Sequence, residues 1–335
     1  MKRLIKLPLF WPCATLLLLI AINAIMNPGF LALTWRDGHL YGNLIDILNR
    51  AAPLALVSAG MTLVIAARGL DISVGAVVAI AAAVAAVVIG DTSNLGFAIG
   101  AALAVALLCG LWNGALVVGV GMQPIIATLI LMVAGRGVAQ LITGGQILTV
   151  YYAPYDFIGN GFLLGLPFAA VLAAAVIALL YLLLTLTPLG LFIRAIGINP
   201  VASRIAGVRA RPITLCLYAF CGLMAGLAGL IISSNVKSAD ANNAGQLLEL
   251  DAILAVTLGG TALTGGKFSL TGTVIGALII QTLTSTIYSL GVPPEVNLVF
   301  KAALIFVVML LQSPDFRASL RRIAIRPPET SGDRP

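Results

Sequence analysis

Long apolar runs separated by short polar segments set the pattern of this chain. Ten runs have the length of a membrane-spanning helix, which needs about 20 residues for a hydrocarbon core of about 30 Å. They lie near residues 8–27, 44–67, 72–90, 95–119, 124–142, 163–186, 213–233, 250–264, 269–290 and 295–312. The run at 250–264 is short for this purpose unless the polar flank at Glu249 and Asp251 is drawn into the membrane. The pattern predicts an all-α polytopic membrane protein with about ten transmembrane helices.

Composition supports the membrane assignment. Of the 335 residues, 60% are apolar and 9% are charged, whereas a soluble domain has about 25% charged residues. The net charge of +7 does not indicate nucleic acid, because no basic stripe with interleaved aromatics is present. The first apolar run, from Pro8 to Met26, is too long for a signal-peptide core and has no cleavage site after it, so we expect a retained span.

Basic residues predict the orientation of the spans. With the N-terminus inside, fourteen of the nineteen Lys and Arg residues fall in cytoplasmic loops and tails, as the positive-inside rule requires. We therefore expect both termini in the cytoplasm. Residues 1–312 would form one transmembrane domain, and residues 313–335, with prolines and alternating charges, a tail that we expect to be disordered.

The loop at 187–212 contains four arginines and no acid. Asn199 is a suitable N-cap for a short helix, Pro200 suits its first position, and Gly207 suits a left-handed end. The prediction is a helix of about two turns, held between two spans on the basic side. Such a helix could dock into another protein, or the segment could be an ordinary cytoplasmic loop with arginines for topology.

The stretch GLDISVG at 69–75 predicts a tight turn before the third span. Asp71 or Ser73 can cap that span, and Arg68 can pair with Asp71. A capped turn explains every residue of the stretch. The alternative places Arg68 and Asp71 against a cytoplasmic partner, beside the predicted short helix.

The sequence offers no catalytic, metal-binding or nucleotide-binding motif. GGTALTGGKF at 259–268 resembles a phosphate-binding loop, but Thr261 and Phe268 stand where the motif needs Gly and a hydroxyl. We interpret it as a turn between spans. The four cysteines have no CxxC or Cys/His pattern, and the single histidine, His39, lies in a loop.

Polar residues inside the apolar runs mark either a hydrophilic path for a polyol or buried pairing between helices, and the sequence does not choose. The set is Asn49, Arg50, Asn113, Arg136, Gln140, Glu249, Asp251, Gln281 and Lys301. Glu249, Asp251 and Lys301 could form one charge network. The outer loops carry residues that could meet an extracytoplasmic partner, namely Tyr151, Tyr152, Tyr155, Asp156, Lys237, Asp240, Asn242 and Asn243.

Three glycine pairs with small-xxx-small spacing predict close helix packing, which we expect inside one subunit more than between subunits. They are Gly96 with Gly100, Gly222 with Gly226, and Gly272 with Gly276.

Three stretches carry a resemblance to a known family: GMTLVIAARGLDISVGA at 60–76, AIGINPVASRIAGV at 195–208 and ELDAILAVTLGGTALTGGKFSLTGTVIGAL at 249–278. They resemble the permease subunits of bacterial ABC importers for simple sugars (the ribose, xylose and galactofuranose group). With residues 123–145 the similarity covers nearly the whole chain. The stretches 43–56 and 237–253 are most similar to the permease of the galactofuranose importer.

The resemblance implies ten spans, the larger (type II-like) class of ABC importers and an inner-membrane location. It also implies a separate ATP-binding subunit that carries ATP and Mg, a second and non-identical permease, and a periplasmic sugar-binding protein. No cofactor would be bound by this chain. The family's coupling helix maps onto Gly197, Asn199, Ala202, Ser203, Arg204 and Gly207. Ile198 and Ser203 depart from residues that are common in the family at those positions.

Three alternatives remain open. The chain could import another pentose or hexose. It could be a proton-coupled secondary transporter that uses the intramembrane acids and Lys301. It could be a membrane enzyme, although no nucleophile–base or paired-carboxylate arrangement supports this.

Overall fold

A computed structural model describes residues 9–36 and 38–291, together with Leu298, Val299, Ala302, Ala303, Phe306, Val307 and Leu310. The chain divides into two compact units after Thr282, and the first holds almost every described element. Its helices are α1 (Phe10–Met26), α2 (Asn43–Ala66), α3 (Val74–Thr92), α4 (Leu95–Ala115) with the π-helical turn η2 (Leu116–Val120), α5 (Pro124–Thr143), α6 (Ala153–Asn160), α7 (Phe168–Leu186), α8 (Leu189–Ile198), α9 (Pro200–Ile205), α10 (Ala210–Asn235), α11 (Leu248–Leu258) and most of α12 (Leu270–Ser289).

Three two-stranded antiparallel sheets supplement the helices. The first pairs β1 (Thr34–Arg36) with β2 (His39–Tyr41), and another pairs β4 (Phe162–Leu163) with β5 (Leu166–Pro167). The third joins segments far apart in the sequence, since β3 (Leu148–Thr149) pairs with β6 (Ser238–Ala239). It ties the loop after α5 to the loop after α10.

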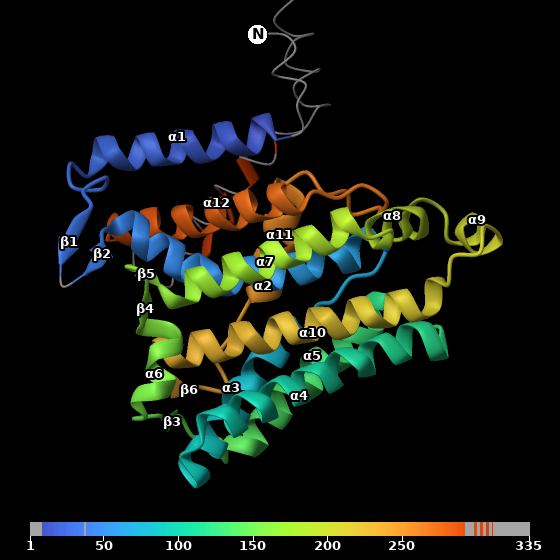
Figure 1. Cartoon of the computed structure of the whole chain (residues 1–335), viewed down its shortest axis with the longest axis horizontal. Coiled ribbons are helices and arrows are strands. Elements are labelled where there is room, and N and C mark those ends of the chain that lie inside the picture. Colours follow the sequence, from blue (N-terminus) through green and yellow to red (C-terminus); the bar gives the residue numbers. More distant parts are fainter. Residues whose placement is uncertain are drawn as a thin grey trace, which may run out of the picture. The chain divides into compact units, whose positions relative to one another are not determined.

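Helices α2, α3 and α10 form the interior of the first unit (Figure 1). Each is buried along most of its length, and α10 packs against α2, α3 and α4. Helices α4, α5 and α7 are buried along a small part of their length only and lie on the outside. Most of their exposed side chains are apolar, with Gln140 of α5 and Thr185 of α7 as polar exceptions, as suits a lipid-facing or subunit-facing surface.

Small residues allow the close helix contacts, because backbones approach closely where side chains are short. A Cβ at Gly222 of α10 would collide with the carbonyl oxygen of Ala106 and the backbone of Gly110 on α4. Gly272 and Gly276 of α12 pack in the same way against Gly259 and Ala255. These pairs confirm packing within one subunit. The third predicted pair does not, because a Cβ at Gly100 would meet nothing within 4 Å.

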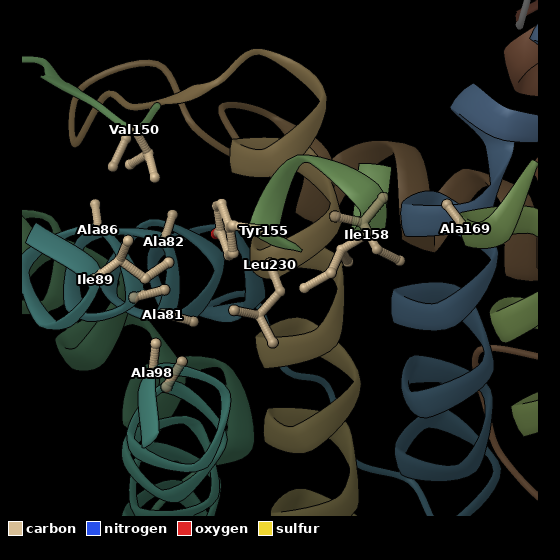
Figure 2. Close-up of a cluster of buried hydrophobic side chains, with 14 of the residues drawn as sticks. Ala81, Ala82, Ala86, Ile89, Ala98, Val150, Tyr155, Ile158, Ala169 and Leu230 are labelled. Carbon is tan, nitrogen blue, oxygen red and sulfur yellow. The ribbon is translucent and has the colours of Figure 1, made fainter. Parts of the chain in front are cut away.

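A large cluster of buried hydrophobic side chains fills the end of this unit at which α6 lies (Figure 2). Alanines of α3 and α4 lie next to Tyr155 and Ile158 of α6 and Leu230 of α10. The alanines let the larger side chains from the loop helix reach between the long helices.

Among the described residues, seven helices are long and apolar enough to cross a membrane: α2, α3, α4 with η2, α5, α7, α10 and α12. They match seven of the ten predicted spans, and the count of ten is not confirmed. The predicted span at 8–27 is the 17-residue helix α1. The one at 250–264 overlaps α11, a helix of 11 residues that begins at Leu248 and is followed by a turn. The predicted span at 295–312 and the tail at 313–335 lie outside the continuously described residues.

Candidate functional site

The short helix predicted from the arginine-rich loop is present as α9. The side-chain oxygen of Asn199 accepts hydrogen bonds from the backbone N–H groups of Val201 and Ala202, each at 3.0 Å. Pro200 is the first helical residue, and Gly207 adopts a left-handed φ of 85°. The predicted N-cap and left-handed end are therefore confirmed, and they define a helix that the chain sequence encodes locally.

Helix α9 presents apolar side chains to its surroundings. Val201 is 70% exposed and Ile205 is 84% exposed, while Ala202 and Arg204 are also exposed. Ser203 is buried, and its hydroxyl donates to the carbonyl of Pro200 at 2.9 Å. This helix of six residues therefore exposes two large apolar side chains, Val201 and Ile205, together with the Arg204 guanidinium.

Arg68 anchors the entrance to α9. Its Nε donates to the carbonyl of Gly197 and its Nη2 to the carbonyl of Ile198, both at 2.7 Å. These are the last carbonyls of α8, which have no partner inside their own helix. A cation is also favoured at a helix C-terminus. The expected pairing of Arg68 with Asp71 was wrong, because the guanidinium is used by these carbonyls.

Backbone contacts reinforce this anchor at a place we call the inner junction, formed by Ala66, Gly197 and Gly266. The Gly266 N–H donates to the carbonyl of Ala66, the last residue of α2, at 2.9 Å. A Cβ at Gly197 would collide with that same carbonyl and with Gly266. Gly266 has a left-handed φ of 83°. The ends of α2 and α8 and the turn at 259–268 are thus held in direct backbone contact.

Asp71 lies in a buried polar cluster with Ser73 and Asn113. Its Oδ1 accepts from the backbone N–H of Ser73 at 3.0 Å, from the Ser73 hydroxyl at 2.6 Å and from Asn113 Nδ2 at 3.3 Å. Asp71 is 1% exposed. Burial raises the pKa of the Asp71 carboxyl, and the hydrogen bonds from Ser73 and Asn113 oppose that rise. The arrangement fixes the turn between α2 and α3 and brings no side chain to the surface.

Arg136 and Gln140 of α5 both bind the loop that precedes α11. Arg136 Nη1 donates to the carbonyls of Ala241 at 3.2 Å and Ala244 at 2.6 Å, and Gln140 donates to the Asn242 side chain at 2.6 Å. Glu249 and Arg136 both lie next to Gly75, where a Cβ would collide with the Glu249 carboxylate. This group combines exposed and buried polar atoms, so it holds α5 against the loop and also offers polar groups at a surface.

The remaining predicted path residues are dispersed. Asn49 donates to the carbonyl of Gly159 at 3.3 Å, and Arg50 is exposed beside it on α2. Asp251 and Gln281 are half-buried on α11 and α12. Lys301, the third member of the expected charge network with Glu249 and Asp251, lies outside the described residues. The geometry therefore favours contacts between segments for the half-buried Asn49 and the fully buried Asn113. The hypothesis of a hydrophilic path then rests on α5 and the loop that it binds.

The opposite end of α10 carries what we call the outer platform, made of α6, β3 and β6. The Ser234 hydroxyl donates to the carbonyl of Tyr155 at 2.6 Å and accepts from the Gly159 N–H at 2.8 Å. Lys237 forms an ion pair with Asp156 at 3.1 Å. Tyr155 is buried, so it packs inside the platform, while Tyr151 is 89% exposed and available to a partner.

Sequence reasoning missed the inner junction and the platform's serine contacts. The adjacent glycines at 265–266 were a signal for a close backbone approach, but nothing in the sequence indicated which segment would approach. Ser233 and Ser234 end an apolar helix, where a pair of hydroxyls is inconspicuous.

Comparison with known proteins identifies the family of the chain. Residues 43–309 match the family described as branched-chain amino acid transport system / permease component. The chain is 47% identical to the galactofuranose transporter permease protein YtfT of Escherichia coli K12, over 97% of this chain and 96% of that protein. It is 42% identical to the fructose import permease protein FruF of Bifidobacterium longum, over 93% and 90% of the two chains.

A ribose import permease, RbsC of Escherichia coli K12, is 37% identical over 89% of this chain and 91% of its own. No solved structure matches the chain. Since the family match and these relatives each cover most of the sequence, this chain belongs to the branched-chain amino acid transport system / permease component family.

Proposed function

We propose that this chain is the transmembrane permease subunit of an ATP-binding-cassette importer that carries a monosaccharide into the cell, with galactofuranose as the first sugar to test. The observation that carries the proposal is 47% identity to a galactofuranose transporter permease along nearly the whole of both chains. Relatives named as fructose and ribose import permeases support the broader class, because they are 42% and 37% identical to this chain over most of its length. Another pentose or hexose is therefore the alternative within the same class.

Helix α9 is the element through which a separate ATPase would drive this chain. Val201 and Ile205 are exposed for docking, and Arg204 stands beside them. The coupling set would be Gly197, Asn199, Ala202, Ser203, Arg204 and Gly207. Arg68 and the inner junction tie the start of α9 to the end of α2, the most completely buried of the spanning helices. A displacement of α9 would then reach the interior of the protein without passing through a flexible loop.

The proposal includes an arrangement in the membrane. Both termini and α9 would face the cytoplasm of a bacterial inner membrane, and the outer platform would face a periplasmic sugar-binding protein. Ten spans would follow if α1, α11 with its preceding loop, and residues 295–312 also cross. Residues 1–312 would then form the permease domain and 313–335 a cytoplasmic tail. ATP and Mg would be bound by the ATPase, and a second, non-identical permease would complete the assembly.

The test is transport by the reconstituted assembly. The permease pair and its ATPase are placed in proteoliposomes, the sugar-loaded binding protein is added on the outside, and uptake of labelled galactofuranose, fructose and ribose is measured. We expect uptake that requires ATP, with galactofuranose carried fastest. Uptake driven by a proton gradient without the ATPase would overturn the proposal in favour of a secondary transporter. ATP-dependent uptake of a different sugar would correct the substrate alone.

A further inference from the structure

Two adjoining cavities in the first unit are lined by residues of α7, α8 and α10 and of the segments next to them, and Leu63 of α2 lines one of the two. The first has a volume of about 470 Å³ and is lined by apolar side chains alone, among them Leu63, Leu180, Cys216, Leu217 and Met224. The second has a volume of about 580 Å³ and is lined by Thr187, Phe192, Gly207, Val208 and Arg209, among others. Leu189 and Ile213 line both cavities, so together they make one surface, which we call the α7–α10 groove.

The groove changes from apolar to basic along its length. Its apolar part runs beside α10 from Met224 to Ile213 and ends at Arg209, the residue before that helix begins. Arg211 follows two residues later, and no acid occurs between Thr187 and Pro212. Among the described residues, one ion pair closer than 4 Å is present, and it joins Lys237 to Asp156 at the other end of α10. An apolar slot with an arginine at its mouth matches a ligand with an apolar body and an anionic head.

The length of the slot decides which amphipathic ligand fits. From Ile213 to Met224 the helix rises by about 16 Å, at 1.5 Å per residue. That is about half of a hydrocarbon core of about 30 Å, and so the depth of one leaflet. A helix from a partner subunit would cover the whole thickness of the membrane, whereas one acyl chain of a phospholipid covers half. The arginine then lies at the level of the headgroup.

We propose that the α7–α10 groove binds an anionic phospholipid of the leaflet at the α9 end, with an acyl chain in the apolar slot and its phosphate at Arg209. In the proposed orientation this is the cytoplasmic leaflet. Basic pockets between transmembrane helices on that side select anionic headgroups. The lipid would contact Pro188 and Leu189 at the start of α8 and Gly207 after α9. It would thereby pack against both ends of the segment that carries the docking helix.

The test uses Cys216, the exposed cysteine that lines the slot. Bimane is attached to it in a full-length chain whose other three cysteines, Cys13, Cys109 and Cys221, are changed to alanine. The chain is placed in nanodiscs with any subunits that co-purify. Fluorescence quenching is measured with phosphatidylglycerol or phosphatidylcholine carrying a nitroxide on the acyl chain, each at the same mole fraction in the same host lipid.

We expect phosphatidylglycerol to quench with about fivefold higher apparent affinity, which is the preference that one arginine near a membrane surface provides. Arg209→Gln should abolish this preference. Arg36→Gln, which removes an arginine from the β1–β2 hairpin, should keep it. Equal quenching by both lipids would mean ordinary bilayer contact and would overturn the proposal. Absence of quenching by either would mean that a protein segment covers the groove and would overturn it too.

A second measurement tests the same proposal without cysteine substitutions, in case those substitutions prevent folding. Native mass spectrometry of the unlabelled protein counts retained phosphatidylglycerol molecules, and Arg209→Gln should retain one fewer than the wild type and Arg36→Gln. Equal counts in all three would overturn the proposal. Neither measurement involves sugar or ATP, so a negative result leaves the transport function standing, and failure of transport leaves the lipid site standing.

Discussion

Replacing Arg68 by glycine tests how Arg68 anchors α9, with only a small change in the stability of the fold. Arg68 has a left-handed φ of 65°, a conformation that costs a non-glycine residue about 1–2 kcal/mol. Glycine adopts the same φ without that cost. Arg68→Gly therefore removes the two hydrogen bonds to Gly197 and Ile198 and, at the same position, relieves backbone strain. Arg68→Ala removes the bonds and keeps the strain.

The two hydrogen bonds give the size of the effect. A hydrogen bond to a charged group contributes about 1.5–3 kcal/mol when it is shielded from water, and exposed charged pairs contribute about 0.2–1 kcal/mol. The bond to Gly197 is half-buried and the bond to Ile198 is exposed. Together we expect about 2 kcal/mol, or an increase of about 30-fold in the frequency with which α9 detaches. The global free energy of unfolding should fall by about 1 kcal/mol in Arg68→Gly, since the relieved strain offsets part of the loss.

Hydrogen exchange measures how often α9 detaches, and the amount of sugar carried per ATP hydrolysed measures its coupling to transport. In the assembled transporter, the amides of Ser203 and Ala206, which bond to carbonyls within the α9 segment, should exchange about 30-fold faster in Arg68→Gly. Sugar carried per ATP hydrolysed should fall, and Arg68→Lys should restore part of it because lysine can reach one carbonyl. Unchanged exchange and an unchanged sugar-to-ATP ratio in Arg68→Gly would refute the anchoring role.

Three further substitutions test the packing. Gly197→Ala should lower the apparent Tm and expression, because even one methyl group collides with the Ala66 carbonyl at the inner junction, at a cost of about 1–3 kcal/mol. Gly222→Ala should destabilise the protein by a similar amount, measured as a lower Tm on thermal unfolding. Gly100→Ala should leave the Tm unchanged, because a Cβ there meets nothing within 4 Å. Equal Tm values for the two variants would contradict the α4–α10 contact. Ser234→Ala should increase proteolysis of the 143–162 loop, because it removes the hydrogen bond from the Gly159 N–H to the Ser234 hydroxyl. The loss costs about 1–3 kcal/mol. Unchanged cleavage would contradict the role of Ser234 in holding the outer platform.

Local features of the fold could be predicted from the sequence because they depend on neighbours in the chain. The cap of Asn199 on α9 and the left-handed Gly207 require residues within eight positions of each other, and both are present. The long apolar runs correctly predicted seven helices long enough to span a membrane, because hydropathy over about 20 residues is also a local property. Helix α11 is shorter than the predicted span at 250–264, because the apolar run continues into the turn at Gly259 and Gly260.

Contacts between distant segments could not be predicted. Arg68 has a nearby acid at Asp71, and charge alone favoured that pair. The fold instead places the ends of α2 and α8 together, and the carbonyls of Gly197 and Ile198 compete successfully for the guanidinium. In the same way Asp71 and Asn113, which are 42 residues apart, are buried together, so the alternative that placed Asp71 against a cytoplasmic partner is not supported.

The most direct test of the account is Ala202→Asp on the docking face of α9. Ala202 is exposed, and an acid in the first turn of a helix favours the helix, so the change alters the surface without unfolding α9. Ala153→Asp makes the same change in the first turn of α6, at the other end of α10. We predict that Ala202→Asp loses the co-purifying ATPase and ATP-dependent sugar uptake while remaining in the membrane, and that Ala153→Asp retains the ATPase. Wild-type ATPase binding and uptake by Ala202→Asp would contradict coupling through α9.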